Sequence, residues 1–144
     1  MEEMVESASY EAIGTAIEVH RYFGPGLLEG IYEDCVCHEL DIRGTPYRRQ
    51  VVLPVFYKGR KCAHSYKLDL LIKECLILEV KSVESLLPIH EAQLLTHLKL
   101  ANLSLGLLIN FNVPVLKKGI KRVINGWGTT KSGEPTDIKT GLTE

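Results

Sequence analysis

The sequence has no hydrophobic run of the length that a membrane span needs. A transmembrane helix takes about 20 consecutive apolar residues, and the 144 residues contain no such stretch. The sequence also lacks a secretory leader pattern, because it begins Met-Glu-Glu-Met-Val-Glu, which is acidic where a leader is basic and then apolar. These absences predict a cytoplasmic protein that does not interact with membranes.

Three chemical motifs are missing as well. None of the four cysteines forms a Cys-x-x-Cys pair, which argues against a zinc site and predicts reduced thiols, most of them buried. His90-Glu91 lacks the second histidine of a zinc-protease helix, because Leu94 stands there. Gly24-Pro25-Gly26 lacks the Gly-Lys-Ser/Thr ending of a phosphate loop. Zinc proteases and P-loop nucleotide-binding proteins are therefore disfavoured.

What is present is the composition of an ordinary folded domain. Hydrophobic residues make up 45% of the chain and charged residues 24%, a balance that excludes disordered and collagen-like classes. The length is enough for one hydrophobic core. We expect a single domain over residues 1–126 and a flexible C-terminal tail over 127–144, where the sequence has no apolar period.

The formal net charge of −1 hides a strong asymmetry along the chain. Residues 1–41 contain ten carboxylates and one base, whereas residues 42–126 contain five carboxylates and fourteen bases. A segregated charge of this kind can form a basic surface that binds nucleic acid. It can equally reflect attraction between the two halves, either within one fold or between copies in a homo-oligomer. The charges alone leave both interpretations open.

Apolar residues at helical spacing predict two helices at the N-terminus. Ser7 or Ser9 can cap a first helix that runs to about Phe23, and a second begins near Leu27 and ends before Gly44. A third helix is expected over Ile89–Ala101, with Asn102 as its stop. On that helix the spacing places Leu94, Leu95, Leu98 and Ala101 on the core side, and His90, Gln93 and His97 on another stripe.

Between the second and third helices the period changes to two, which is typical of strands. Alternation from Tyr47, a turn at Lys58-Gly59 and a run over residues 61–72 predict an antiparallel hairpin. Residues 75–83 and 104–113 are nearly all apolar, which is typical of strands covered on both faces. The type of residues 116–124 stays open. We therefore predict an α/β fold with a four-stranded mixed central sheet flanked by helices on both faces, in the order α-α-β-β-β-α-β.

Three charged residues stand out within these apolar strands. Burying an ionised carboxylate is costly unless a partner or a metal compensates for it, yet Asp69, Glu79 and Lys81 fall on neighbouring predicted strands. Glu79 and Lys81 share a face because they are two apart. Asp69 joins that face only if the loop around Glu74 has an odd length, because a two-residue turn would send it to the opposite side. We expect an odd loop or a bulge.

If these residues converge, they can perform metal-assisted hydrolysis of a phosphodiester. A divalent cation relieves the repulsion between two carboxylates, and oxygen ligands suit Mg²⁺ or Mn²⁺. Lys81 could then orient the nucleophile or stabilise charge on the phosphate. The alternative is a structural ion pair between Lys81 and one of the acids at the strand ends.

The pattern Asp69, ten residues, then Glu79-Val80-Lys81 resembles the signature of the PD-(D/E)XK nuclease superfamily. The order of predicted elements is similar to that superfamily's restriction-endonuclease-like core. Gly26-Leu-Leu-Glu29-Gly-Ile-Tyr32 also resembles the motif that names its bacterial and archaeal GxxExxY branch. The resemblance runs from about Ser7 to Ile124. It departs from the signature at Leu68, where the superfamily often has proline.

The resemblance implies roles for individual residues. It implies that Asp69 and Glu79 bind the metal, that Lys81 is the catalytic lysine, and that Glu29 is a helix-borne acid beside the metal. Gln93 resembles the glutamine of the Gln-x-x-x-Tyr motif of RecB-like nucleases, although His97 replaces the tyrosine. Tyr32 could either pack or hold the Glu29 carboxylate through its hydroxyl.

The sequence thus favours a magnesium-dependent or manganese-dependent nuclease that acts on DNA. The alternative is a module on the same fold that binds nucleic acid or protein and has lost turnover. Basic residues on the predicted hairpin are candidates for phosphate contacts; they are Arg48, Arg49, Lys58, Arg60, Lys61 and Lys67.

Overall fold

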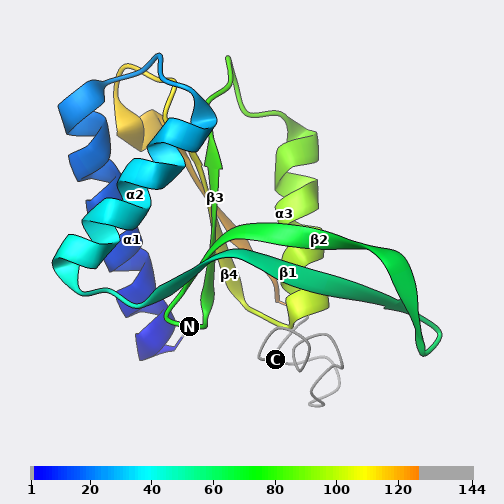
Figure 1. Ribbon diagram of the computed structural model, residues 1–144. Coiled ribbons are helices and arrows are strands. Elements are labelled where there is room, and N and C mark those ends of the chain that lie inside the picture. The colour runs from blue at the N-terminus through cyan, green and yellow to red at the C-terminus, as the bar shows by residue number, and fades with distance from the viewer. Residues whose placement is uncertain (1, 127–144) are drawn as a thin grey trace.

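A computed structural model describes residues 2–126 of the chain, so the expected tail at 127–144 lies outside the described residues. The described chain forms three α-helices, five strands and one 3₁₀ turn (Figure 1). In chain order they are α1 (Glu3–Phe23), α2 (Glu29–Arg43), β1 (Tyr47–Tyr57), β2 (Arg60–Ile72), β3 (Leu76–Lys81), α3 (Pro88–Ala101), β4 (Leu105–Asn110), η1 (Leu116–Gly119) and β5 (Ile120–Ile124).

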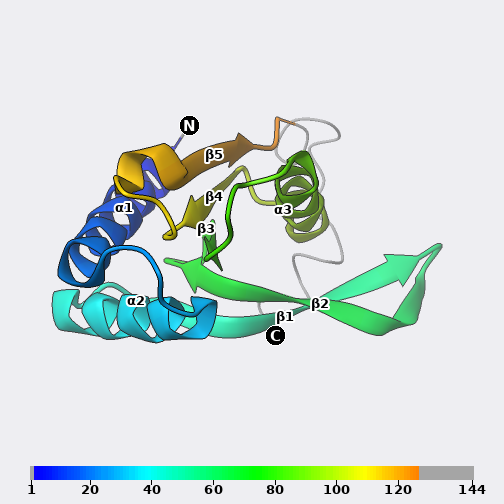
Figure 2. The same cartoon turned by 90° about the horizontal axis from the view of Figure 1, so that it is seen from above.

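The strands form one mixed sheet in the order β1-β2-β3-β4-β5. Only β3 and β4 run parallel, and α3 connects them, as parallel neighbours need a crossover. Helices α1 and α2 cover one face of the sheet and α3 covers the other (Figure 2). The predicted α/β class with helices on both faces is therefore confirmed.

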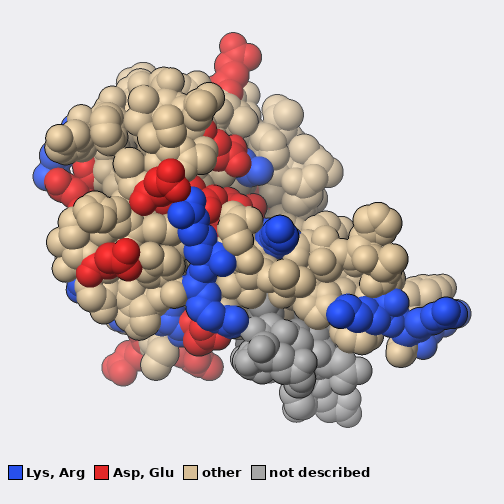
Figure 3. Space-filling model, in the orientation of Figure 1, with Lys and Arg blue, Asp and Glu red and all other residues tan. Residues whose placement is uncertain are grey.

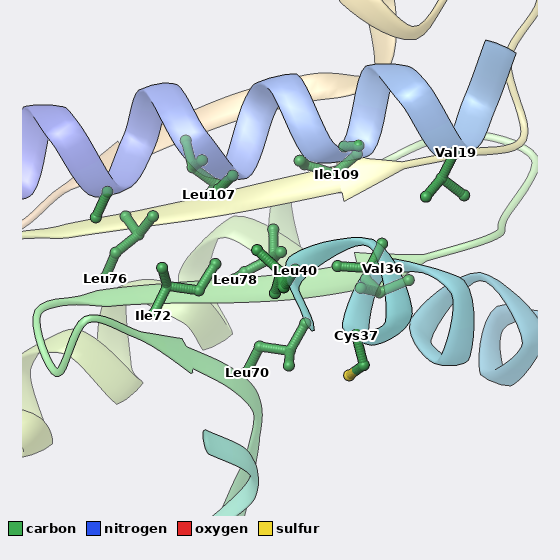
Figure 4. Close-up of a cluster of buried hydrophobic side chains, with 14 of the residues drawn as sticks. Val19, Val36, Cys37, Leu40, Leu70, Ile72, Leu76, Leu78, Leu107 and Ile109 are labelled. Atoms are coloured by element: carbon green, nitrogen blue, oxygen red, sulfur yellow. The ribbon is translucent and has the colours of Figure 1, made fainter. Parts of the chain in front are cut away.

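The central strands are buried on both faces because their side chains alternate between two cores. In β3, Leu76, Leu78 and Val80 pack with α1 and α2, whereas Ile77 packs with α3. Figure 4 shows the larger core, where side chains of β2, β3 and β4 meet Val36 and Leu40 of α2.

The prediction of four strands was wrong, because residues 120–124 form a fifth strand antiparallel to β4. In this strand only Val123 is buried, and Lys121 and Arg122 are exposed, as is usual for a short, charged edge strand. Gly119 permits the turn into β5, because a Cβ at this position would lie 2.1 Å from the main-chain oxygen of Asn110. The strand was not predicted because its sequence has only a weak apolar period.

Two smaller predictions also needed correction. Helix α1 begins at Glu3 rather than at a Ser7 or Ser9 cap, because Val5 and Ala8 already pack into the core. The four cysteines are free, as expected, but of these only Cys37 is buried and Cys62 is exposed on the hairpin. The stops predicted at Gly44 and Asn102 are confirmed, and both residues have left-handed backbone conformations.

The β1–β2 hairpin extends well beyond the rest of the sheet (Figures 1 and 2). Strand β2 runs from Arg60 to Ile72, yet only Leu70, Leu71 and Ile72 pair with β3. Lys58 and Gly59 form the two-residue turn at its tip, as predicted, and both have positive φ angles, as a type I′ hairpin turn requires. None of the described helices is long and apolar enough to cross a membrane.

The close approach at Gly119 gives a test of how β5 is placed. We expect Gly119→Ala to lower the free energy of unfolding by about 1–3 kcal/mol, because the new methyl group must displace the Asn110 backbone. Gly30→Ala is the matched control, since a Cβ there meets nothing within 4 Å and alanine favours a helix by about 1 kcal/mol. Urea unfolding measures both, and equal stability of the two variants would contradict the close packing of η1 on β4.

Candidate active site

The loop between β2 and β3 sets which charged side chains can meet. Ile72 pairs with Leu76, so three residues lie between them, and Lys73 and Glu74 both take positive φ angles. The odd loop length that we expected is present. Because Leu70 pairs with Leu78, this register brings Asp69 beside Glu79 at the point where the paired residues of the two strands end.

Asp69 lies where β2 separates from β3. The paired residues of the two strands end at Leu70 and Leu78, so the next main-chain groups of β3 lose their partner strand. The Asp69 side chain takes over one of these bonds, because its Oδ2 accepts a hydrogen bond from the backbone N–H of Val80 at 2.9 Å. This bond fixes the Asp69 carboxylate beside β3 and satisfies a buried donor.

Glu79 is more buried than Asp69 and is only 9% exposed. Burial raises the pKa of Asp69 to about 6 and that of Glu79 to about 7, and the negative charge of Asp69 contributes to the shift of Glu79. The positive charge of Lys81 acts on both acids in the opposite direction and lowers their pKa values. The electrostatics therefore couple Asp69, Glu79 and Lys81 in one site.

Two acids of α2 approach this group. The negative charge of Glu29 raises the pKa values of Asp69 and Glu79, and that of Glu33 raises the pKa of Asp69. Glu33 is buried and accepts hydrogen bonds from Arg49 Nε at 2.6 Å and Gln50 Nε2 at 3.0 Å. Glu33 was not among the residues predicted from the sequence, although its position four residues after Glu29 places both on one helix face.

The start of α2 is fastened to the end of β3. Ser82 Oγ donates a hydrogen bond to the main-chain oxygen of Leu27 at 2.7 Å. The buried Tyr32 ring stacks on Phe111, and its hydroxyl donates to the Gly24 main-chain oxygen and accepts from the Leu27 N–H. Of the two roles considered for Tyr32, the structure shows packing; its hydroxyl holds the turn before α2 rather than the Glu29 carboxylate.

Helix α3 brings His97 to the site. His97 is buried, its Nδ1 lies 3.9 Å from Glu79 Oε2, and its ring packs on Tyr66 of β2. Burial and the charge of Lys81 lower the pKa of His97, which favours its neutral form. His97 is absent from the apolar core of α3 and lines a cavity with Gln93, in keeping with the predicted stripe, but the period did not indicate that its ring is buried. Gln93, on the same helix, is exposed and lines a small cavity with Tyr66 and His97.

The carboxylate oxygens of this site are of the kind that bind a divalent cation, but they are not arranged around a cation position. Among residues 2–126, no group of three or more His, Cys, Asp and Glu side chains is arranged to hold a metal ion. Glu79 Oε2, however, is buried and has no hydrogen-bond partner. An unpaired carboxylate oxygen beside a second acid is what an oxygen-binding cation such as Mg²⁺ or Mn²⁺ would neutralise.

The basic residues of the hairpin divide into two groups. At the base of the hairpin, Arg48 Nε and Nη2 donate to both carboxylate oxygens of Glu74 at 2.7 and 2.8 Å, and Arg49 pairs with Glu33 and Asp34. Lys58, Arg60, Lys61 and Lys67 are exposed further along the hairpin. Figure 3 shows basic side chains at the hairpin's free end and acidic side chains between α2 and α3.

A protein-family model described as the PD-(D/E)XK nuclease superfamily matches residues 6–123. The chain belongs to the PD-(D/E)XK nuclease superfamily. No curated protein and no solved structure gave a significant match. The match includes the acids Asp69 and Glu79, and the mixed sheet flanked by helices is consistent with the PD-(D/E)XK fold. Membership of the GxxExxY branch stays a prediction, since the match concerns the superfamily.

The burial of the acids has a testable effect on the stability of the protein. Because the folded state raises the pKa of Glu79 from 4.5 to about 7, it binds more protons than the unfolded state in this interval, and stability falls as pH rises from about 4 to about 7. Glu79→Gln removes this effect. We therefore expect the variant to melt several degrees above the wild type at pH 8 and to lose most of that advantage at pH 5.

Thermal unfolding followed by circular dichroism at the two pH values provides the measurement. The matched control is Glu84→Gln, because Glu84 is an exposed acid only five residues further along the chain. It should melt like the wild type at both pH values. A Glu79→Gln variant that is equally or less stable than the wild type at pH 8 would show that the Glu79 carboxylate is adequately solvated or paired in the folded protein.

Proposed function

We propose that this protein is a metal-dependent nuclease that hydrolyses phosphodiester bonds in DNA. The observation that supports the proposal is the closeness of Asp69, Glu79 and Lys81, whose charges act on one another where β2 separates from β3, in a chain of the PD-(D/E)XK nuclease superfamily. Two neighbouring acids, one buried and one partly buried, whose pKa values are raised to about 7 and about 6, are typical of a functional site rather than of a purely structural ion pair.

Asp69 and Glu79 would hold the cation, and Glu29 would complete the set from the start of α2. Glu29 is exposed, so its side chain can turn toward the two acids without leaving a packed position. Bound Mg²⁺ or Mn²⁺ supplies charge for the scissile phosphate and a more acidic water. Lys81 lies close enough to lower the pKa values of both acids, and in the proposed role its ammonium orients the nucleophile and stabilises negative charge on the phosphate.

The substrate would cross the face between α2 and α3 and continue along the hairpin. Lys58, Arg60, Lys61 and Lys67 are exposed there, and exposed lysine and arginine side chains are the usual contacts to phosphates. Gln93 lies on α3 beside the hairpin residue Tyr66. In this position it would face the DNA strand on its path from the carboxylates to the hairpin. Arg48 and Arg49 would add positive potential at the base of the hairpin.

Isosteric removal of the two acids tests the proposed chemistry. We expect Asp69→Asn and Glu79→Gln to lower cleavage of DNA to about a hundredth or less, because electrostatic stabilisation of the transition state commonly contributes at least that factor. A nicking and degradation assay with Mg²⁺ or Mn²⁺ on single-stranded and double-stranded DNA measures this effect. Glu84→Gln is the control for loss of an exposed acid.

Calorimetry with Mn²⁺ separates this proposal from its alternative. A nuclease should bind the ion, and both variants should bind it at least tenfold more weakly, in the range of about 10–100-fold that changes around a metal site commonly cause. Full cleavage by Asp69→Asn and Glu79→Gln preparations would show that a contaminant cuts the DNA. A wild-type protein that binds neither cation would favour a binding module without turnover.

The hairpin predicts a salt-dependent contribution to DNA affinity. We expect Lys58→Gln, Arg60→Gln and Lys61→Gln together to weaken DNA binding. The slope of log affinity against log salt should also become less negative, by about 0.9 for each phosphate of duplex DNA that the variant no longer neutralises. Titration of labelled DNA at several salt concentrations, with Ca²⁺ in place of Mg²⁺, gives both quantities.

Three exposed lysines outside the hairpin provide a control of equal charge. Lys99, Lys117 and Lys118 lie at the end of α3 and in η1, and their change to glutamine also removes three positive charges. If both triple variants weaken binding equally, the hairpin makes no specific contact and only the total charge of the protein matters.

A further inference from the structure

Two buried polar atoms without hydrogen-bond partners lie next to each other beneath α3. They are Glu79 Oε2 and His97 Nδ1, and 3.9 Å separates them. Only one other side-chain atom in the described residues, Thr15 Oγ1 in α1, is buried and unpartnered in this way. Buried polar atoms of this kind are rare and cost free energy. Because two of the three lie side by side, we infer that they interact with each other.

The chemistry of the two groups decides which one donates. An ionised carboxylate only accepts hydrogen bonds, whereas a neutral imidazole donates from one nitrogen and accepts at the other. The separation of 3.9 Å exceeds the usual limit of about 3.2 Å for a direct hydrogen bond. A small side-chain movement can close this gap. One water can close it as well, since His97, though not Glu79, borders a cavity of about 120 Å³ that is large enough to hold water.

The His97 ring is held in place from two sides. Its backbone belongs to α3, whose Leu94 and Leu98 are buried in the smaller core. Its ring packs on Tyr66 of β2, with centroids 4.7 Å apart and the planes tilted by 52°. A ring fixed between a helix and a strand can fix the carboxylate beside it.

We propose that His97 is a positioning residue for Glu79. As the Nδ1–H tautomer it donates to Glu79 Oε2, directly or through one water, and holds the carboxylate toward Asp69. The part of this inference that concerns the cation rests on the proposed function. His97 itself touches neither the cation nor the substrate, and its contribution is the fixed orientation of one ligand, as for other residues that support metal ligands.

Nitrogen NMR of the metal-free protein tests the contact without any reaction. At pH 8.5, where Glu79 is ionised, His97 should show the Nδ1–H tautomer, and Glu79→Ala should shift the Nδ1 resonance. An Nε2–H tautomer in the wild type would overturn the inference. A wild type that binds no Mn²⁺ would overturn the proposed function, while the tautomer would still decide whether His97 holds Glu79.

Three substitutions at His97 test its effect on the cation. His97→Phe keeps a ring against Tyr66 but removes the donor, and we expect it to weaken Mn²⁺ binding and lower kcat by about 10–100-fold, with KM for DNA nearly unchanged. His97→Asn places an amide nitrogen near the Nδ1 position and should restore most of the binding and activity. His97→Gln places it near Nε2 and should not. The exposed His38 of α2 provides the control, as His38→Phe.

Melting temperatures show whether each variant is folded. If folded His97→Phe binds Mn²⁺ as tightly as the wild type, or if His97→Asn binds it as weakly as His97→Phe, His97 has no positioning role. Rescue by asparagine alone supports the Nδ1 contact, because poorer packing would affect asparagine more than phenylalanine.

Discussion

The hydrogen bond from the Val80 N–H to Asp69 marks the constraint on which the rest of the site depends. Strand β2 must leave β3 so that the hairpin can project, and a buried strand whose partner departs exposes unpaired main-chain groups. A carboxylate at the point of separation satisfies one of them. The same side chain is thereby fixed beside β3, where its charge acts on Glu79, so the group that satisfies the backbone also creates the acidic pair.

The fold can tolerate the acidic pair because its stability comes from other parts of the structure. Isolated buried carboxylates oppose folding, and here burial raises both pKa values. Two apolar cores, one on each face of the sheet, enclose the strands that carry these acids. Tyr32 and Ser82 hold the turn before α2 against the end of β3. The site is thus a region of electrostatic strain within an otherwise well-satisfied scaffold.

Much of this arrangement could be predicted from local patterns. The turn at Lys58-Gly59 and the stop at Asn102 follow from the conformational preferences of short segments. The odd loop before β3 was inferred instead from the strand parity that would bring Asp69 to Glu79. The fifth strand could not, because an edge strand with one buried residue has almost no apolar period. Glu33 and His97 were missed for another reason: their partners Arg49 and Tyr66 lie far away in the sequence, so the period of their own helices does not show that these polar residues are buried.

The two interpretations of the charge asymmetry apply to different parts of the hairpin. At its base, Arg49 joins β1 to the acidic helix α2 through Glu33 and Asp34, so attraction between the halves of the chain acts within one fold. These guanidinium groups already have carboxylate partners, and a phosphate would have to compete for them. The cations at the tip, Lys58, Arg60 and Lys61, are exposed, and the Lys58 ammonium lies over the ring of Tyr57. Ion pairs therefore occupy the cations at the base, whereas the cations at the tip lie apart from them on the projecting hairpin. In the proposed function an extended polyanion, rather than a small one, would be needed to reach both the tip and the carboxylates.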